Sequence, residues 1–204
     1  MPDIFLFLIA AVTLTLAPGP DNIYVLMRAV AQGRAAGLTA AAGFCSGLLL
    51  HTLLAVVGFA AIIKAWPAAY DALRYAGAAY LIYLGVRTLR AAASLSSAAL
   101  MAPLKLSRIY WQSVIANMLN PKVTLFFIAF LPQFVHVEAG HVDAQMLLLA
   151  IVFILQALLI FSAIAFFSGI VGAYFQRRTH AASWLNRLAG CAFVGLGIRI
   201  ALPE

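Results

Sequence analysis

The chain has 204 residues, of which 65% are hydrophobic and 9% are charged, and its mean hydropathy is +1.03. Soluble domains carry about 25% charged residues, so this composition excludes a soluble globular protein and predicts an all-α polytopic membrane protein. The net charge of +7 does not indicate a nucleic-acid partner, because the basic residues lie in short loops and at segment ends, as membrane topology requires.

Six hydrophobic segments follow one another along the chain, and each exceeds the roughly 20 residues that a transmembrane helix needs or comes close to it. The expected segments are residues 4–27, 37–63, 69–89, 109–134, 144–172 and 183–202. The longest loop is 91–107, and the loop 135–143 carries acids and histidines. We therefore expect one transmembrane transporter domain over residues 1–204.

The first segment is interrupted by Pro18, Gly19, Pro20, Asp21 and Asn22. Proline lacks an N–H and clashes with the preceding helical turn, so the segment is predicted to form two half-helices. A broken helix is tolerated at membrane depth only where it is buried in protein or lines a wet cavity. A carboxylate well inside a membrane segment costs roughly 3 kcal/mol or more, so Asp21 indicates a functional site.

The basic residues are unevenly distributed between the two sides of the predicted domain. The odd-numbered loops hold Arg28, Arg34, Arg87, Arg90, Lys105, Arg108, Arg177 and Arg178, and the other side holds Lys64, Arg74 and Arg199. Because cytoplasmic loops are enriched in Lys and Arg, we expect the odd loops in the cytoplasm and both termini in the periplasm.

Two short matches relate the halves of the chain. Pro20 and Asp21 in segment one correspond to Pro121 and Lys122 in segment four, and the sequence Leu-Gly-Val-Arg at 84–87 corresponds to Leu-Gly-Ile-Arg at 196–199. Three segments per repeat require the second half to be inverted, so we expect a 3+3 inverted repeat of residues 1–92 and 106–204, with helices one and four broken. Matching breaks in inverted halves are typical of a transport site.

The two breaks are expected to meet in one central cavity. Half-helix N-termini carry free N–H groups and partial positive charge, which suit a carboxylate. Asp21 and Lys122 are expected to face each other there. Asn117 precedes Asn120 by three residues, so the two are expected to share a helix face. The predicted substrate-binding residues are Pro18, Gly19, Pro20, Asp21, Asn22, Asn117, Asn120, Pro121 and Lys122.

Gly43, Gly47 and His51 are four residues apart and share one face of segment two. Small residues at this spacing let a neighbouring helix approach closely. Gly77, Gly85 and Gly197 are also expected at helix contacts. His51 is expected either to look into the cavity, as a second candidate beside Asp21 for proton coupling, or to be a buried histidine with a neighbouring partner. Gln156 is the one amide in the middle of segment five.

Several stretches together resemble the lysine exporter and homoserine-threonine exporter (LysE/RhtB) family. They are the Pro18–Asn22 break, the stretch 77–85, Asn120-Pro121-Lys122, and Leu-Pro-Gln-Phe at 131–134. The resemblance covers essentially the whole chain. It implies a multi-pass protein of the bacterial inner membrane that exports amino acids and is driven by the proton gradient.

The leading hypothesis is therefore a secondary exporter of small amino acids by proton antiport, with no cofactor and no enzymatic activity. Its partners would be the amino acid, protons and the lipid bilayer. A homo-oligomer is left as an alternative to a monomer. One alternative is a divalent-cation exporter of related fold, although the segments lack a cluster of metal ligands. Another is a thiol-redox electron carrier, although Cys45 and Cys191 lie away from the breaks. A non-transporting scaffold is the third.

The loop after segment four could in principle bind a metal. It carries His136, Glu138, His141 and Asp143, but without the spacing of a zinc site. We therefore expect a solvated outer loop and no metal centre.

Overall fold

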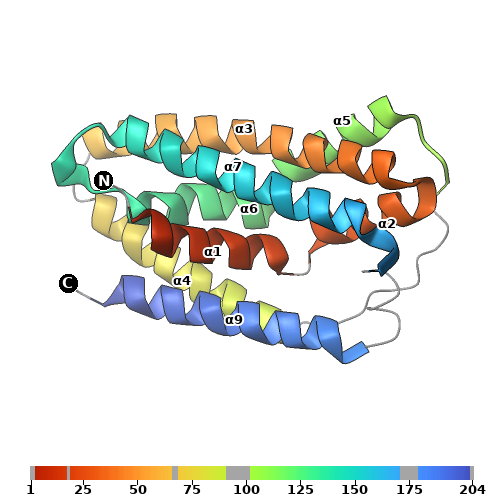
Figure 1. The fold of residues 1–204 in the computed structure, drawn as a ribbon. Coiled ribbons are helices and arrows are strands. Elements are labelled where there is room, and N and C mark those ends of the chain that lie inside the picture. The colour runs from red at the N-terminus through yellow and green to blue at the C-terminus, as the bar shows by residue number, and fades with distance from the viewer. Residues whose placement is uncertain (1–2, 18, 66–68, 91–101, 171–178, 203–204) are drawn as a thin grey trace.

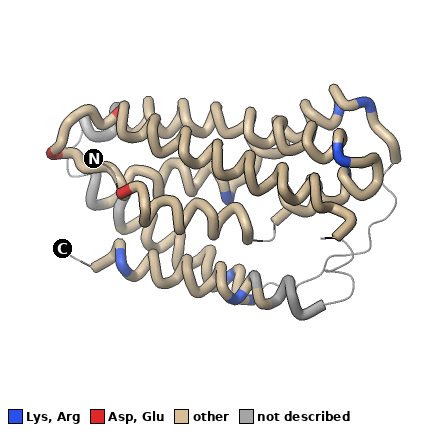
Figure 2. The backbone as a smooth tube through the Cα atoms, viewed as in Figure 1, with Lys and Arg blue, Asp and Glu red and all other residues tan. Residues whose placement is uncertain are grey.

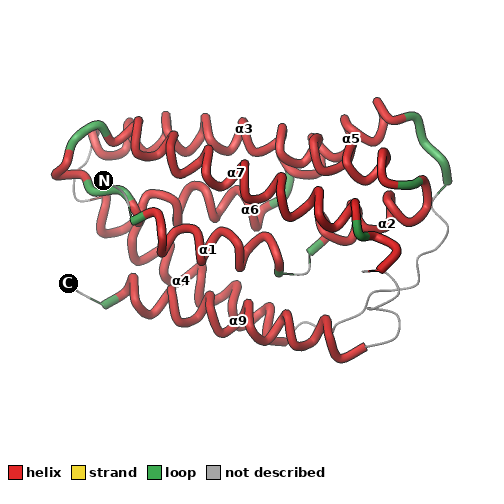
Figure 3. The backbone as a smooth tube through the Cα atoms, viewed as in Figure 1, coloured by secondary structure: helices red, strands yellow, loops and turns green. Residues whose placement is uncertain are grey.

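The computed structural model describes residues 3–17, 19–65, 69–90, 102–170 and 179–202. Within these ranges every element is a helix, and the long helices run roughly side by side (Figures 1 and 3). The long elements are α1 (Ile4–Leu16), α2 (Pro20–Gln32), α3 (Arg34–Ala65), α4 (Ala69–Arg90), α5 (Leu106–Met118), α7 (Val142–Phe166) and α9 (Thr179–Ala201). The short ones are α6 (Pro121–Leu125), the π-helical η1 (Phe126–Phe130) and the 3₁₀ turns η2 (Leu131–Phe134) and η3 (Val137–Ala139).

Within the described ranges, two single helices, α3 and α7, are long and apolar enough to cross a membrane. Two further spans are possible if each bent pair counts as one: α1 with α2, bent by 56°, and α5 with the stretch Pro121–Phe134, bent by 49°. Both bends lie at the prolines that were predicted to interrupt segments one and four.

The connection between the first two segments differs from the predicted basic loop. α2 continues to Gln32, and only Gly33 separates it from α3, which begins at Arg34. Gly33 makes this turn in one residue because its φ of 86° is readily available to glycine. Arg28 consequently lies inside a helix and is only 5% exposed. Its guanidinium donates to the Gln32 side chain at 2.9 Å and to the Ala102 carbonyl at 3.0 Å.

The pair α4 and α9 packs through glycine. A Cβ at Gly85 would lie 2.7 Å from the Gly190 carbonyl oxygen, and a Cβ at Gly197 would lie 2.8 Å from the Ala78 carbonyl oxygen. Each helix therefore requires a glycine where its partner crosses. The absence of a side chain at these positions explains the close approach of the two backbones (Figure 1). Gly77 is buried on the same helix as Gly85.

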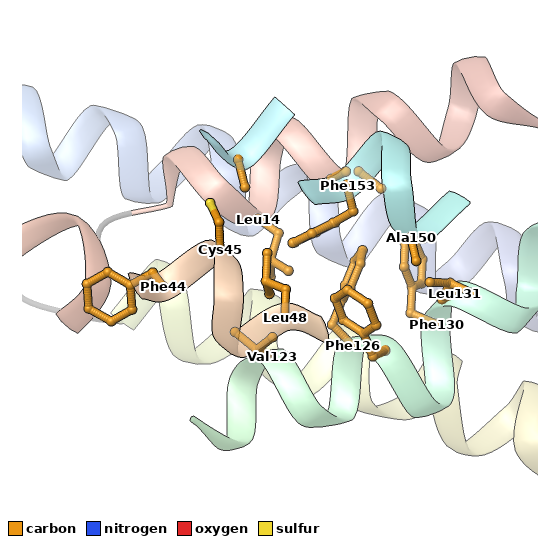
Figure 4. Close-up of a cluster of buried hydrophobic side chains, with 14 of the residues drawn as sticks. Leu14, Phe44, Cys45, Leu48, Val123, Phe126, Phe130, Leu131, Ala150 and Phe153 are labelled. Atoms are coloured by element: carbon orange, nitrogen blue, oxygen red, sulfur yellow. The ribbon is translucent and has the colours of Figure 1, made fainter. Parts of the chain in front are cut away.

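The core contains a cluster of buried phenylalanines around α6 and η1 (Figure 4). The Phe126 ring lies 4.6 Å from Phe130 and 5.2 Å from Phe153, and the Phe7 ring lies 5.3 Å from Phe134. Aromatic pairs at such distances stabilise a core beyond their buried area. The outside of the bundle is also apolar: Phe5, Leu159 and Ile170 are more than 70% exposed. This outer surface suits contact with lipid rather than with water.

Charged residues gather at the ends of the bundle (Figure 2). Apart from Asp21 and Lys122 at the two helix breaks, the acidic residues seen in Figure 2 lie at the end that holds the N-terminus, and most basic residues lie toward the opposite end. The bundle therefore has an acidic end and a basic end, separated by the length of its helices.

Candidate functional site

The first break leaves the C-terminal carbonyls of α1 without helical partners. In an unbroken helix the Leu14 carbonyl would accept from residue 18, but Pro18 has no N–H. Pro18 itself lies outside the described residues. Asn22 folds back from α2, and its Nδ2 donates to the Thr15 carbonyl at 2.8 Å and to the Ala17 carbonyl at 3.5 Å. The Asn22 side chain of α2 thus provides a hydrogen-bond donor for carbonyls that the break leaves free at the end of α1.

The second break begins after Met118, where α5 ends. Asn120 is the N-cap of α6, and its Oδ1 accepts from the Lys122 backbone N–H at 3.1 Å. Pro121 removes the helical donor for the Asn117 carbonyl, which accepts instead from the Asn120 N–H at 2.9 Å. Asn117 and Asn120 were predicted to share one helix face. This prediction was wrong, because the helix ends between them, although both still line the same pocket.

Side chains of the second break reach into the first. Asn120 Nδ2 donates to both carboxylate oxygens of Asp21, at 3.1 and 3.0 Å. Lys122 Nζ donates to the Leu14 carbonyl at 2.9 Å and to the Ala17 carbonyl at 3.5 Å. Lys122 is thus hydrogen-bonded to the end of α1 and not to Asp21.

A cavity of about 30 Å³ lies between the two breaks. Polar groups from both breaks line one part of it, namely Thr15, Asp21, Asn22, Asn117, Asn120 and Lys122. Apolar side chains line the remainder, namely Leu14, Leu48, Val123, Phe153, Ala157 and Phe161. Gly19 and Pro20 complete the wall. Pro121 is exposed, and its contribution is to break the helix rather than to line the cavity.

The two helix ends at the first break differ in their free groups. Gly19, the N-cap of α2, has no side chain to cap it, so the N–H groups of Asp21 and Asn22 have no side-chain acceptor at that end. The N-terminus of α6, in contrast, is capped by Asn120. The C-terminal carbonyls of α1 lie beside the uncapped N-terminus of α2. One break therefore presents an anion-binding end and a cation-binding end to the same cavity.

His51 lies behind the cavity rather than in its wall. It is 2% exposed, and its Nε2–H donates to the Asn117 carbonyl at 3.0 Å. Nδ1 has no partner among the described residues. Gly43 and Gly47 share its face, which packs on α5: a Cβ at Gly43 would lie 2.5 Å from the Tyr110 carbonyl oxygen, and one at Gly47 would lie 2.7 Å from Asn117. Of the two alternatives expected for His51, the structure therefore supports the buried histidine with a neighbouring partner, because the glycines seat this face directly against α5.

Two polar residues of α1 and α7 extend the site. Gln156 Nε2 donates to the Thr15 hydroxyl at 2.9 Å, and that hydroxyl donates to the Ala11 carbonyl at 2.9 Å. The Oε1 of Gln156 and the Oδ1 of Asn117 are buried acceptors without a partner in the described part of the chain. The sequence reasoning missed Thr15, whose signal is a hydroxyl three residues before Pro18. It also missed the apolar wall, which no local pattern marks.

The remaining candidates lie elsewhere. Among the described residues, no three His, Cys, Asp or Glu side chains converge on a possible metal position. The loop acids and histidines at 136–143 are exposed. Cys45 is buried on α3, whereas Cys191 is exposed on α9.

Comparison with known proteins gives consistent matches over nearly the whole chain. A family model described as LysE type translocator matches residues 12–203. An uncharacterized membrane protein of Pseudomonas aeruginosa is 33% identical over 98% of this chain and 94% of its own length. A leucine efflux protein of Salmonella typhimurium is 32% identical over 96% of this chain and 92% of its own length, and one of Enterobacter sp. is 31% identical over 96% and 93%. No solved structure matches the chain.

Proposed function

Because the chain belongs to the LysE type translocator family, we propose that it exports a small amino acid with an aliphatic side chain, by proton antiport across the bacterial inner membrane. The observation that carries the proposal is the cavity between the two breaks, which combines helix ends of both polarities with an apolar wall. The relatives from Salmonella typhimurium and Enterobacter sp. carry the name leucine efflux protein, and a branched aliphatic side chain suits such a wall.

The amino acid would lie across the first break. Its carboxylate would accept from the uncapped N–H groups of Asp21 and Asn22, with the Lys122 ammonium within reach. Its ammonium would face the Asp21 carboxylate, which Asn120 holds in place. Its side chain would contact the apolar wall, to which Leu48 and Phe161 belong.

Asp21 would bind the substrate ammonium and a driving proton in alternation. A carboxylate in a small cavity can hold either cation but not both, and this exclusion is what an antiport cycle requires. One proton moving inward at 100 mV releases about 2.3 kcal/mol, which sustains a useful outward gradient. His51 is the second candidate for the coupling proton, since it bonds to Asn117 in the cavity wall.

Alternating access would come from the two repeats, residues 1–92 and 106–204, in inverted orientation. The glycines of the repeated tetrapeptide support this: Gly85 packs on α9, and Gly197 packs on α4. A cavity of about 30 Å³ has room for about two water molecules and no leucine. The site must therefore widen before it can accept substrate, as rocking of one repeat against the other would allow. The basic end of the bundle would face the cytoplasm, with both termini in the periplasm (Figure 2).

The test is counterflow in proteoliposomes that contain the purified protein and unlabelled leucine. Labelled leucine should be taken up against its gradient, and external isoleucine or valine should compete, while lysine and threonine should compete weakly. Preferred exchange of lysine or threonine would contradict the aliphatic specificity. No exchange of any amino acid, in vesicles that contain folded protein, would contradict the export function itself.

A further inference from the structure

The C-terminal end of α1 is a cation site that already holds a cation. Lys122 Nζ lies 2.9 Å from the Leu14 carbonyl oxygen and 3.5 Å from that of Ala17, and a Cβ at Gly19 would lie 3.7 Å from it. The Leu14 carbonyl is left free by the proline at position 18, so this acceptor is built into the sequence. The C-terminal end of a helix carries partial negative charge, which adds to the attraction.

Lys122 carries the same chemical group as one end of an amino acid. Both present a primary ammonium with three N–H donors. The carbonyls that Lys122 binds belong to Leu14 of α1, which lines the cavity, and to Ala17, the C-cap of α1. A second ammonium at these carbonyls would lie directly beside the Lys122 ammonium, and two like charges at such close range repel each other strongly.

We propose that Lys122 is a tethered stand-in for the substrate ammonium. In the empty protein it occupies the carbonyl subsite at the end of α1. An arriving amino acid displaces it with its own ammonium, which then lies between these carbonyls and the Asp21 carboxylate in the same cavity. The released Lys122 then pairs with the substrate carboxylate. The inference rests on the proposed function and assigns a subsite and a selection step to it.

The exchange makes the protein selective for zwitterions over simple amines. An amino acid compensates for the displacement, because it brings a carboxylate to which Lys122 can bind. A simple amine takes both the carbonyls and the Asp21 carboxylate, so it leaves Lys122 in the cavity without a free anion, and an unpaired buried charge is costly. When nothing is bound, Lys122 keeps the buried carbonyls hydrogen-bonded, which avoids the penalty of unsatisfied acceptors.

The experiment compares leucine with 3-methylbutylamine, which has the same side chain and ammonium but no carboxylate. Each is titrated as an inhibitor of labelled-leucine counterflow and as a stabiliser of the purified protein against heat. The wild type should bind leucine and reject the amine. Lys122→Met removes the charge and retains most of the stem, so it should bind the amine at least tenfold more tightly than the wild type does. Lys122→Arg keeps a cation and should continue to reject the amine.

Two results would overturn the inference. One is equal binding of leucine and amine by the wild type, which needs no variant. The other is a loss of leucine binding in Lys122→Met without any gain in amine binding, because Lys122 would then be only a ligand of the carboxylate. Lys122→Gln provides a second neutral variant if Lys122→Met does not fold. Failure of the proposed function appears separately, as absence of leucine counterflow in the wild type.

Discussion

Asn120 donates its side-chain amide to both carboxylate oxygens of Asp21, at 3.1 and 3.0 Å, across 99 positions of sequence. The same side chain caps α6 through its other atom, Oδ1. Asn120 therefore caps the helix that follows the second break and also holds the Asp21 carboxylate at the first break. This arrangement leads to predictions that separate the structural task of a side chain from its part in transport.

Asn120→Ala should lose both tasks of this side chain. Loss of the N-cap should lower the stability of the protein by about 1 kcal/mol, and loss of the donor to Asp21 should weaken leucine binding. Asn120→Ser can still cap α6 but is too short to reach the carboxylate in the same way, so it should restore stability without restoring binding. Thermal unfolding in detergent and leucine titration measure the two effects. Equal binding by Asn120→Ser and wild type would show that Asp21 does not need this hydrogen bond.

Asp21→Asn should abolish uphill export while retaining slow downhill exchange. The amide keeps the size and hydrogen-bonding capacity of the side chain but cannot bind and release a proton. The measurement is leucine accumulation in vesicles with an imposed pH gradient, beside counterflow without a gradient. Asp3→Asn is the matched control, since Asp3 is an exposed cap at the start of α1. If Asp21→Asn concentrates leucine to the wild-type extent, the coupling proton is carried elsewhere, and His51→Gln becomes the next variant to measure.

Gly43→Ala should destabilise the protein, although alanine is the better helix former. Its Cβ would lie 2.5 Å from the Tyr110 carbonyl oxygen, so α5 must move away from α3, at a cost of roughly 1–3 kcal/mol. Gly58→Ala in the same helix is the control: a Cβ there meets nothing within 4 Å, and the substitution should stabilise by roughly 0.5–1 kcal/mol. Melting temperatures of the two variants should move in opposite directions. A Gly43→Ala protein as stable as wild type would show that α3 and α5 can separate freely.

The proposed topology predicts opposite activities for two fusions. Alkaline phosphatase folds only in the periplasm, so a fusion after Glu204 should be active and one after Ser97 inactive. The physical reason is the excess of Lys and Arg on the side of the odd loops, which would hold that side in the cytoplasm. A cytoplasmic reporter at the same positions should give the complementary pattern. An inactive fusion at Glu204 with an active one at Ser97 would reverse the orientation.

Much of this protein was predictable because the deciding properties are local. Apolar composition requires helices in a bilayer, since backbone groups cannot remain unpaired there. Proline lacks an N–H wherever it occurs, so Pro18 and Pro121 mark the two breaks and the carbonyls they leave free without knowledge of any partner. The four-residue spacing of Gly43, Gly47 and His51 likewise defines one helix face before its neighbour is known.

The tertiary structure decided which side chains bind the backbone carbonyls that the prolines leave free. Nothing in the sequence around Lys122 indicates that its ammonium binds the Leu14 carbonyl rather than Asp21, because that choice depends on where α6 crosses α1. The position of His51 depended on α5, which packs against its face and leaves it behind the cavity wall. The apolar wall is assembled from α1, α3, α6 and α7, which meet only in the fold. The sequence by itself therefore determined where the helices break, and packing between distant helices determined what each break can bind.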